Sequence, residues 1–307
     1  MNATPKRPVE WPTLLVLAAT YLAWGAGTMI WQETAVVSVI LTAVAITQFS
    51  SLQHEALHGH PLQSEGWNEV LVFPALMLFL PYRRFRDTHL QHHYDPALTD
   101  PYDDPESNFR DPGEWAALSA VTQAVLRWNN TLAGRMMVGP ALSTWQFLRT
   151  DFAMIRAGDR AVITAWLLHL PGLVMVGVWL AVYAMMPFWA YLVAVYLALA
   201  LLRIRTFLEH RAHDRYRART VVVEDRGLLS LLFLNNNFHV VHHMHPNVAW
   251  YRLPALYAAR KEHFLRRNEG YVYRNYLEVM RQHLWRAKDP VPHPIFPVKK
   301  PTPDDAA

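Results

Sequence analysis

Two stretches of the sequence, His89-Leu-Gln-His-His93 and His239-Val-Val-His-His243, share one histidine spacing, and His54-Glu-Ala-Leu-His58 precedes both. On a helix, positions i, i+3 and i+4 share a face, so the imidazoles of each stretch point the same way. Imidazole is a good ligand for iron, copper, nickel and zinc. A lone histidine is more often a structural residue, but eight in three matched groups favour metal binding. Because eight imidazoles exceed what one metal ion normally takes from a protein, the pattern predicts two metal ions close together.

The composition points to a membrane protein. The chain has 307 residues, of which 52% are hydrophobic and 18% charged, and the apolar residues concentrate in long runs between polar segments. Such runs are typical of helices that cross a bilayer. Since the sequence has no cysteine, it excludes disulfides, thiolate zinc sites and cysteine-ligated iron–sulfur clusters. The net charge of +4 is interpreted as basic residues near the membrane ends that face anionic lipids. Nucleic-acid binding is not indicated, because the sequence has no basic patch interleaved with aromatic residues.

Four runs approach the roughly 20 apolar residues that a spanning helix needs. They are residues 11–31, 35–49 with an extension into Leu52, 161–186 and 188–202. A fifth apolar run, residues 69–82, is shorter and is interrupted by Pro74 and Pro81. We interpret it as an interfacial or re-entrant segment, because a fifth span there would put the first two histidine groups on opposite faces of the membrane.

Four spans put all three histidine groups on the face that holds the N-terminus. Lys6 and Arg7 precede the first span, and further arginines flank the second histidine group and the fourth span, so the positive-inside rule makes this face cytoplasmic. We expect an integral multi-pass protein of a bacterial inner (cell) membrane. A cleaved signal peptide is the competing interpretation of the first run, but that run is long for a signal and a second run follows at once.

The sequence predicts one all-α domain over residues 11–288, with about four transmembrane helices and a cytosolic helical cap that holds a histidine-rich dimetal site. Residues 1–10 are expected to be an N-terminal cytosolic segment, and the Pro-rich composition of residues 289–307 indicates a loose tail. The acidic stretch 100–106 is interpreted as a solvated, turn-rich surface in preference to a metal site, because Pro and Asp both favour turns. His293 and three other isolated histidines are expected to be structural or surface residues.

A shorter motif competes for the first histidine group. His54-Glu55-x-x-His58 is the zincin pattern, in which a helix presents two histidines to zinc and the glutamate acts as general base. A membrane zinc metalloprotease is therefore an alternative, but it leaves the other six clustered histidines unexplained. A metal transporter with histidine-rich loops fits less well, because transporters keep their coordinating residues near the middle of the membrane.

At these residues the chain resembles the membrane fatty acid desaturase family, which also includes hydroxylases and carotenoid ketolases. The order His-x-x-x-His, His-x-x-His-His and His-x-x-His-His, with a long apolar insert before the last, is very specific to this family. Asn68 after the first group, the stretch 205–210 after the last span and the stretch 235–246 around the third group match further family features. The resemblance covers roughly residues 10–285, judged by motif order and hydropathy.

The resemblance implies a non-haem diiron centre held almost wholly by histidine. The iron ligands that it implies are His54, His58, His89, His92, His93, His239, His242 and His243, with His210 as the ninth. The residues that it implies as catalytic support, orienting an imidazole through its second ring nitrogen, are Glu55, Asp87, Glu209 and Asn236. For Asp87, an ion pair with Arg84 or Arg86 is an equally good interpretation. For His210, the alternative is a surface histidine.

The resemblance also implies an oxidoreductase that uses O₂ as co-substrate and removes hydrogen from an unactivated C–H bond. We expect a fatty acyl desaturase that inserts a double bond into a lipid acyl chain, with a hydroxylase or carotenoid ketolase on the same scaffold as the alternative. The two electrons of each turnover are expected from a separate ferredoxin, rubredoxin or cytochrome with its reductase, because the chain has no cysteines and no room for a fused haem domain. The cationic cytoplasmic face is expected to dock this donor.

Overall fold

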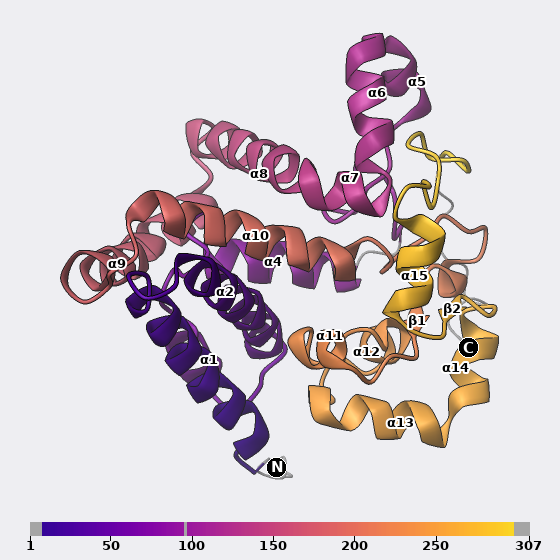
Figure 1. Ribbon diagram of the computed structural model, residues 1–307. Helices are drawn as coiled ribbons and strands as arrows, with labels where there is room; N and C mark the ends of the chain where they lie inside the picture. Colours follow the sequence, from indigo (N-terminus) through magenta and orange to yellow (C-terminus); the bar gives the residue numbers. More distant parts are fainter. Residues whose placement is uncertain (1–7, 95–96, 298–307) are drawn as a thin grey trace. The chain divides into compact units, whose positions relative to one another are not determined.

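The computed structural model describes residues 8–94 and 97–297, and Figure 1 shows their helices and strands in chain order. The chain forms two compact units. The first unit comprises the residues before 87 together with 144–199 and 249–251, and the second comprises 87–143, 200–248 and the residues from 252 onward. Most of the predicted N-terminal segment, with Lys6 and Arg7, and most of the predicted tail lie outside the described residues.

The first unit contains the longest apolar helices. It holds α1 Trp11–Met29, α2 Ala35–Leu57, α3 Glu65–Leu71 and α9 Arg160–Val182, with parts of α4 Tyr82–Tyr94, α8 Gly139–Arg156 and α10 Phe188–Thr206. Among the described residues, α1, α2, α9 and α10 are long and apolar enough to cross a membrane. The prediction of four spans is therefore confirmed by length and composition. Helix α2 is longer than expected and runs on through His54 to its end beside His58.

Small residues let α1 and α2 approach closely, and the two helices run side by side in Figure 1. A Cβ atom added to Gly27 would lie 2.6 Å from Oγ1 of Thr42, so a side chain at this position would force the helices apart. The Ser38 hydroxyl donates to the Gly27 carbonyl oxygen at 2.6 Å, which satisfies both polar groups without water. This contact fixes α2, the helix that carries His54, against α1.

Residues 72–81 form no regular helix, as expected for an apolar run interrupted by proline. Their backbone is held against α9, because the Ala75 N–H donates to the Gly172 carbonyl at 3.3 Å and the His169 imidazole donates to the Leu78 carbonyl at 2.8 Å. A Cβ atom added to Gly172 would lie 2.8 Å from a backbone oxygen of this segment, so glycine permits the close approach. Irregular backbone packed against protein is the form that a re-entrant segment takes, and no fifth spanning helix is present here.

The second unit is built from short elements. It holds α5 Pro112–Ala117, α6 Ala120–Asn129, α7 Leu132–Met137, η1 Tyr216–Ala218, β1 Val222–Val223, α11 Leu228–Leu232, α12 His239–Met244, α13 Leu253–Ala259, α14 Lys261–Arg267, β2 Val272–Tyr273 and α15 Tyr276–His283, while η2 Trp250–Arg252 contributes to both units. The strands pair in parallel, Val222 with Val272 and Val223 with Tyr273. Apart from this pair, the described residues are helical or irregular, so the all-α prediction is confirmed in its main point.

An apolar core surrounds the end of α10 and supports the third histidine group. Its buried members include Phe207, Phe233 and Tyr276. The chain just before and within α12 bonds to the residues around β1: the Val223 N–H donates to the Asn237 carbonyl at 2.8 Å, and the Val240 N–H donates to the Val221 carbonyl at 3.0 Å. Since a six-residue helix is marginal by itself, these bonds to its surroundings hold α12 in place.

Candidate metal centre

Four imidazoles of the second unit converge on one point. They belong to His92 of α4, His210 after α10, and His239 and His243 of α12, and one ring nitrogen of each lies within 4.8 Å of the others. The Nε2 atom of His210 is 2.9 Å from that of His92 and 3.1 Å from that of His239. The Nε2 atoms of His239 and His243 are also 3.1 Å apart. Three segments that are distant in the sequence thus bring their imidazole nitrogens to one place, which we call the four-imidazole group.

The spacing of these nitrogens fits a transition-metal ion. Two imidazole nitrogens that each lie about 2.1 Å from one ion, as in zinc sites, are about 3.0 Å apart when the two bonds are at right angles. When His92 and His239 are neutral, their Nδ1–H groups donate away from the centre, so the lone pairs of their Nε2 atoms face the other rings. Facing lone pairs repel, and a cation between them removes the repulsion. A donor set of imidazoles alone suits iron, copper, nickel or zinc.

Burial keeps the α12 imidazoles in the neutral form that binds metal. Burial and the neighbouring rings lower the pKa of His239 and of His243 well below the ordinary value. Burial also lowers the pKa of His92, but the nearby Glu106 and Asp104 outweigh it and raise that pKa to about 9. Because a metal ligand must be neutral, metal binding at this group would release a proton from His92.

A second set of imidazoles lies beside the first within the same unit. The Nε2 atom of His93 is 3.0 Å from that of His89 and 3.1 Å from that of His242. Burial, followed by the repulsion from His89, lowers the pKa of His93 to about 2. The rings of His93 and His243 stack with their centroids 4.2 Å apart. The second unit therefore gathers seven of the nine implied ligands into two adjacent sets.

Two carboxylates of the acidic stretch hold the α4 imidazoles from behind. The Nδ1–H of His92 donates to Asp104 at 2.7 Å, and the Nδ1–H of His89 donates to Glu106 at 2.8 Å. Asp104 is 4% exposed, and its second oxygen accepts the Thr99 N–H at 2.8 Å. The interpretation of the acidic stretch as a solvated surface is therefore wrong for these two carboxylates. Partners of this kind fix the tautomer and the direction of a metal-binding ring.

A different set of partners lies behind His239. Its Nδ1–H donates to the Asn236 side-chain oxygen at 3.2 Å, and the Asn236 amide donates to Glu209 at 3.1 Å. Burial raises the pKa of Glu209, and the guanidinium of Arg205, 3.0 Å away, opposes the rise. Asn236 and Glu209 thus form a hydrogen-bonded series behind the His239 imidazole. Both are residues that the family resemblance implied as orienting groups.

The first unit holds the other two implied ligands at the end of α2. The ring centroids of His54 and His58 are 4.8 Å apart, so the two imidazoles lie on the same side of the helix end. Glu55 is buried, and one of its oxygens accepts the Trp250 N–H at 3.1 Å while the other lies 3.9 Å from Nδ1 of His54. A carboxylate that holds a backbone N–H is poorly placed to be the general base of a zinc protease.

The surroundings of Asp87, and of Arg84 and His60 near the histidine groups, bear on the roles of these residues. Asp87 lies half-buried on α4, and its role as an orienting group stays a prediction. Arg84, one of the two arginines considered as its partner, forms a buried ion pair with Asp151 at 2.9 Å. His60, beside the first histidine group, donates to Glu10 at 2.7 Å.

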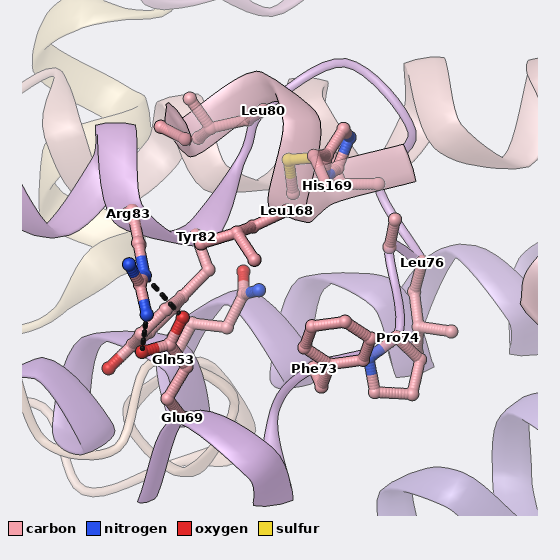
Figure 2. Close-up of a pocket in the computed structure, with 13 residues that line it drawn as sticks. Gln53, Glu69, Phe73, Pro74, Leu76, Leu80, Tyr82, Arg83, Leu168 and His169 are labelled. Atoms are coloured by element: carbon pink, nitrogen blue, oxygen red, sulfur yellow. Dashed lines mark hydrogen bonds and ion pairs between the residues drawn. The ribbon is translucent and has the colours of Figure 1, made fainter. Parts of the chain in front are cut away.

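A small pocket lies in the first unit beside α2 (Figure 2). It is lined by Gln53 of α2, by the irregular segment 72–81 and by residues of α9 that include His169. Arg83 and Glu69 form an ion pair at 2.7 Å on one side of it. The cavity of about 20 Å³ has room for roughly one water molecule. In this form the pocket is too small for an acyl chain.

Comparison with known proteins identifies relatives of the whole arrangement. The family model described as "Fatty acid desaturase" matches residues 29–275, a range that includes all nine histidines implied as ligands. The chain is also similar to a beta-carotene ketolase of Paracoccus sp. (strain N81106 / MBIC 01143). The two are 26% identical over 276 residues, which cover 83% of this chain and 96% of the ketolase.

Proposed function

Because the chain belongs to the fatty acid desaturase family, we propose that two non-haem iron ions bind at its histidine groups and that O₂ is its co-substrate. Family membership makes the protein a membrane oxidoreductase of the desaturase, hydroxylase or ketolase type. The proposed iron ligands are His54, His58, His89, His92, His93, His210, His239, His242 and His243. The last seven lie in the second unit, and the first two are proposed on the family motif.

The four-imidazole group carries this proposal. The Nε2 atoms of His92 and His239 both lie within 3.1 Å of the Nε2 atom of His210, a spacing that suits nitrogen ligands of one ion. His93 belongs to a second set with similar spacing. Two adjacent sets of imidazoles support two metal ions rather than the single zinc of a metalloprotease.

When bound, an iron pair supplies the reduction of O₂ that allows an unactivated C–H bond to be oxidised. The side chains of this protein hold the ligands in position for it. Asp104 and Glu106 keep a proton on Nδ1 of each α4 ligand that they contact, so the Nε2 lone pair of that ring faces the centre. Asn236 does the same for His239. Burial of these rings keeps bulk water away from the nitrogens.

We propose that the substrate is a lipid acyl chain and that the product carries a new double bond. Removing two hydrogen atoms from the chain while O₂ becomes two water molecules requires two electrons and two protons from outside. The proposed electron donor is a separate ferredoxin, rubredoxin or cytochrome with its reductase. We further propose that the histidine groups face the cytoplasm across a bacterial inner membrane, because the positive-inside rule favours that orientation.

A ketolase is the second candidate, because the beta-carotene ketolase aligns with most of this chain and nearly all of its own. Oxidation of a carotenoid C–H bond to a ketone would use the same histidine groups. A ketolase would insert oxygen at one carbon in two rounds that convert CH₂ to C=O, each round using one O₂, two electrons and two protons, whereas a desaturase removes one hydrogen from each of two neighbouring carbons. Substrate position relative to the metal ions decides between these outcomes.

Metal content and product identity test the proposal. The purified full-length protein should hold about two iron ions per chain, whereas one zinc per chain would contradict the iron proposal and support the metalloprotease. The gene should then be expressed in one bacterial host with saturated acyl lipids and in another that makes β-carotene. Mass spectrometry of the lipids should show acyl chains lighter by two hydrogens. A keto-carotenoid with unchanged acyl chains would replace the first candidate with the second.

A further inference from the structure

Residues 288–295, which we call the strap, lie against the acidic stretch and the chain that follows it. The Arg110 N–H donates to the Val291 carbonyl at 2.9 Å, and the His293 N–H donates to the Arg110 carbonyl at 2.8 Å. These bonds form a parallel bridge between Arg110 and Pro292. The prediction of a loose tail over residues 289–307 is therefore wrong for residues 289–295, which backbone hydrogen bonds hold in place despite their proline content.

The strap reaches His92 through a short series of buried contacts. His293 accepts the Ile295 N–H on Nδ1 at 3.1 Å, so its proton lies on Nε2, which donates to the Thr99 hydroxyl at 3.1 Å. The Thr99 N–H in turn donates to Asp104 at 2.8 Å, and Asp104 accepts the Nδ1–H of His92. Movement of the strap would therefore disturb the carboxylate that orients this imidazole.

The strap also contacts His210 directly. The Lys288 ammonium donates to the His210 carbonyl oxygen and, at 3.2 Å, to the Tyr271 hydroxyl, and it pairs with Asp289 at 2.7 Å. Only 9% of the Lys288 side chain is exposed, so these protein groups are the main partners of its charge. His210 lies beyond the last residue of α10, and its position depends on contacts of this kind rather than on a helix.

We propose that the strap is a positioning element of the metal centre, in which Lys288 holds His210 and His293 holds His92 through the acidic stretch. The inference rests on the proposed metal centre. Both imidazoles belong to the four-imidazole group, so loss of the strap contacts should weaken metal binding at that group first. Removing a partner that orients a metal ligand typically lowers metal affinity about 10- to 100-fold.

Two substitutions in the full-length protein test the two contacts. Lys288→Gln removes the charge, and His293→Phe keeps a ring but removes the hydrogen bond to Thr99. We expect each to lower iron affinity about tenfold or more, measured by competition with a chelator. Lys288→Arg keeps a cation at this position and should recover most of the affinity. Lys261→Gln is the matched control, because Lys261 also pairs with a carboxylate of the second unit, Glu224 at 2.6 Å, and should leave iron affinity unchanged.

Mössbauer spectra of the iron-loaded protein separate positioning from a general loss of stability. Lys288→Gln should alter the signal of one iron and spare the other, whereas a general loss of stability would change both signals. If the unaltered protein holds no iron, the proposed metal centre itself is overturned. If the unaltered protein holds two irons and both strap variants keep its affinity, or lose both signals equally, the role of the strap alone is overturned.

Discussion

Helices α4 and α12 carry the same His-x-x-His-His spacing but maintain it by different means. Helix α4 has 13 residues and α12 has six. A longer helix forms more readily, because each added residue contributes a hydrogen bond after the costly first turn. Helix α12 follows a turn in which Leu234 and Asn235 have φ angles of 47° and 54°, and it is tied by its backbone to the residues around β1. The same spacing is thus maintained by the length of the helix in α4 and by hydrogen bonds to neighbouring residues in α12.

The two helices also differ in the groups behind their imidazoles. On α4, the carboxylates of Asp104 and Glu106 accept the Nδ1–H groups, whereas on α12 the neutral amide of Asn236 accepts the Nδ1–H of His239. Hydrogen bonds to a charged acceptor are about twice as strong as neutral ones. The shared motif therefore does not determine how firmly each imidazole is oriented. We expect the orientation of the α4 imidazoles to depend more on their partners than that of His239 does.

Loss of an imidazole from either helix should have the largest effect. His92→Ala and His242→Ala each remove one nitrogen from a converging set, so each should abolish turnover and lower the iron content of the purified protein. Membrane insertion should remain intact, because the spans are unchanged. Iron per chain and lipid products measure the effect. His263→Ala, an exposed and isolated position on α14, is the control, and full turnover in either test variant would remove that residue from the ligand set.

Loss of the Asp104 carboxylate, which is buried behind α4, should have the second-largest effect. Asp104→Ala leaves the Nδ1–H of His92 without the buried carboxylate that accepts it, so iron affinity should fall about 100-fold. The exposed neighbour Asp103 provides the control, since Asp103→Ala removes the same charge from the same loop. Chelator competition on both purified variants gives the comparison. Equal affinities in the two variants would show that the Asp104 contact does not support the metal centre.

Composition and spacing were sufficient to predict the spans and the histidine groups. In lipid, a single segment must satisfy its backbone polar groups internally, so long apolar runs form helices whatever the rest of the fold does. The spacing i, i+3 and i+4 likewise puts the α4 imidazoles on one face independently of their neighbours. The limits of α2 were less certain, because its last turn carries polar residues such as His54 that no hydropathy rule assigns to a span.

Asp104, Glu106 and Lys288 could not be identified in the same way. The two acids lie in a stretch rich in Pro and Asp, a composition that usually forms solvated turns, and Lys288 borders a Pro-rich tail. Asp104 meets an imidazole 12 positions away, and Lys288 meets the His210 backbone 78 positions away. A single sequence carries no direct sign of such contacts. His210 itself was singled out through the family motif that contains it, not through helical spacing.

Loss of the partly exposed Glu106 carboxylate behind α4 should have a smaller effect than loss of the buried Asp104 carboxylate. The Glu106 side chain is 28% exposed, so in Glu106→Ala a water molecule can accept the Nδ1–H of His89. We expect iron affinity to fall about tenfold, and less than in Asp104→Ala. The exposed Glu114 of α5 is the control position for removal of a glutamate. A larger loss for Glu106→Ala than for Asp104→Ala would contradict the idea that burial sets the order.

Of the four kinds of substitution, loss of the Asn236 amide behind α12 should have the smallest effect on iron binding. Asn236→Ala removes a neutral hydrogen bond from His239, and such a bond contributes about 1 kcal/mol, or roughly a fivefold change in iron affinity. Asn275→Ala is the matched control, because Asn275 caps α15 and its loss should cost about 1 kcal/mol of stability without changing iron affinity. Chelator competition and thermal unfolding separate the two outcomes. If Asn236→Ala weakened iron binding as much as Asp104→Ala, the charge of the acceptor would not explain how the two helices differ. The hydrogen bond from Asn236 to Glu209 and the ion pair of Glu209 with Arg205 would then have to orient His239 as firmly as a carboxylate does.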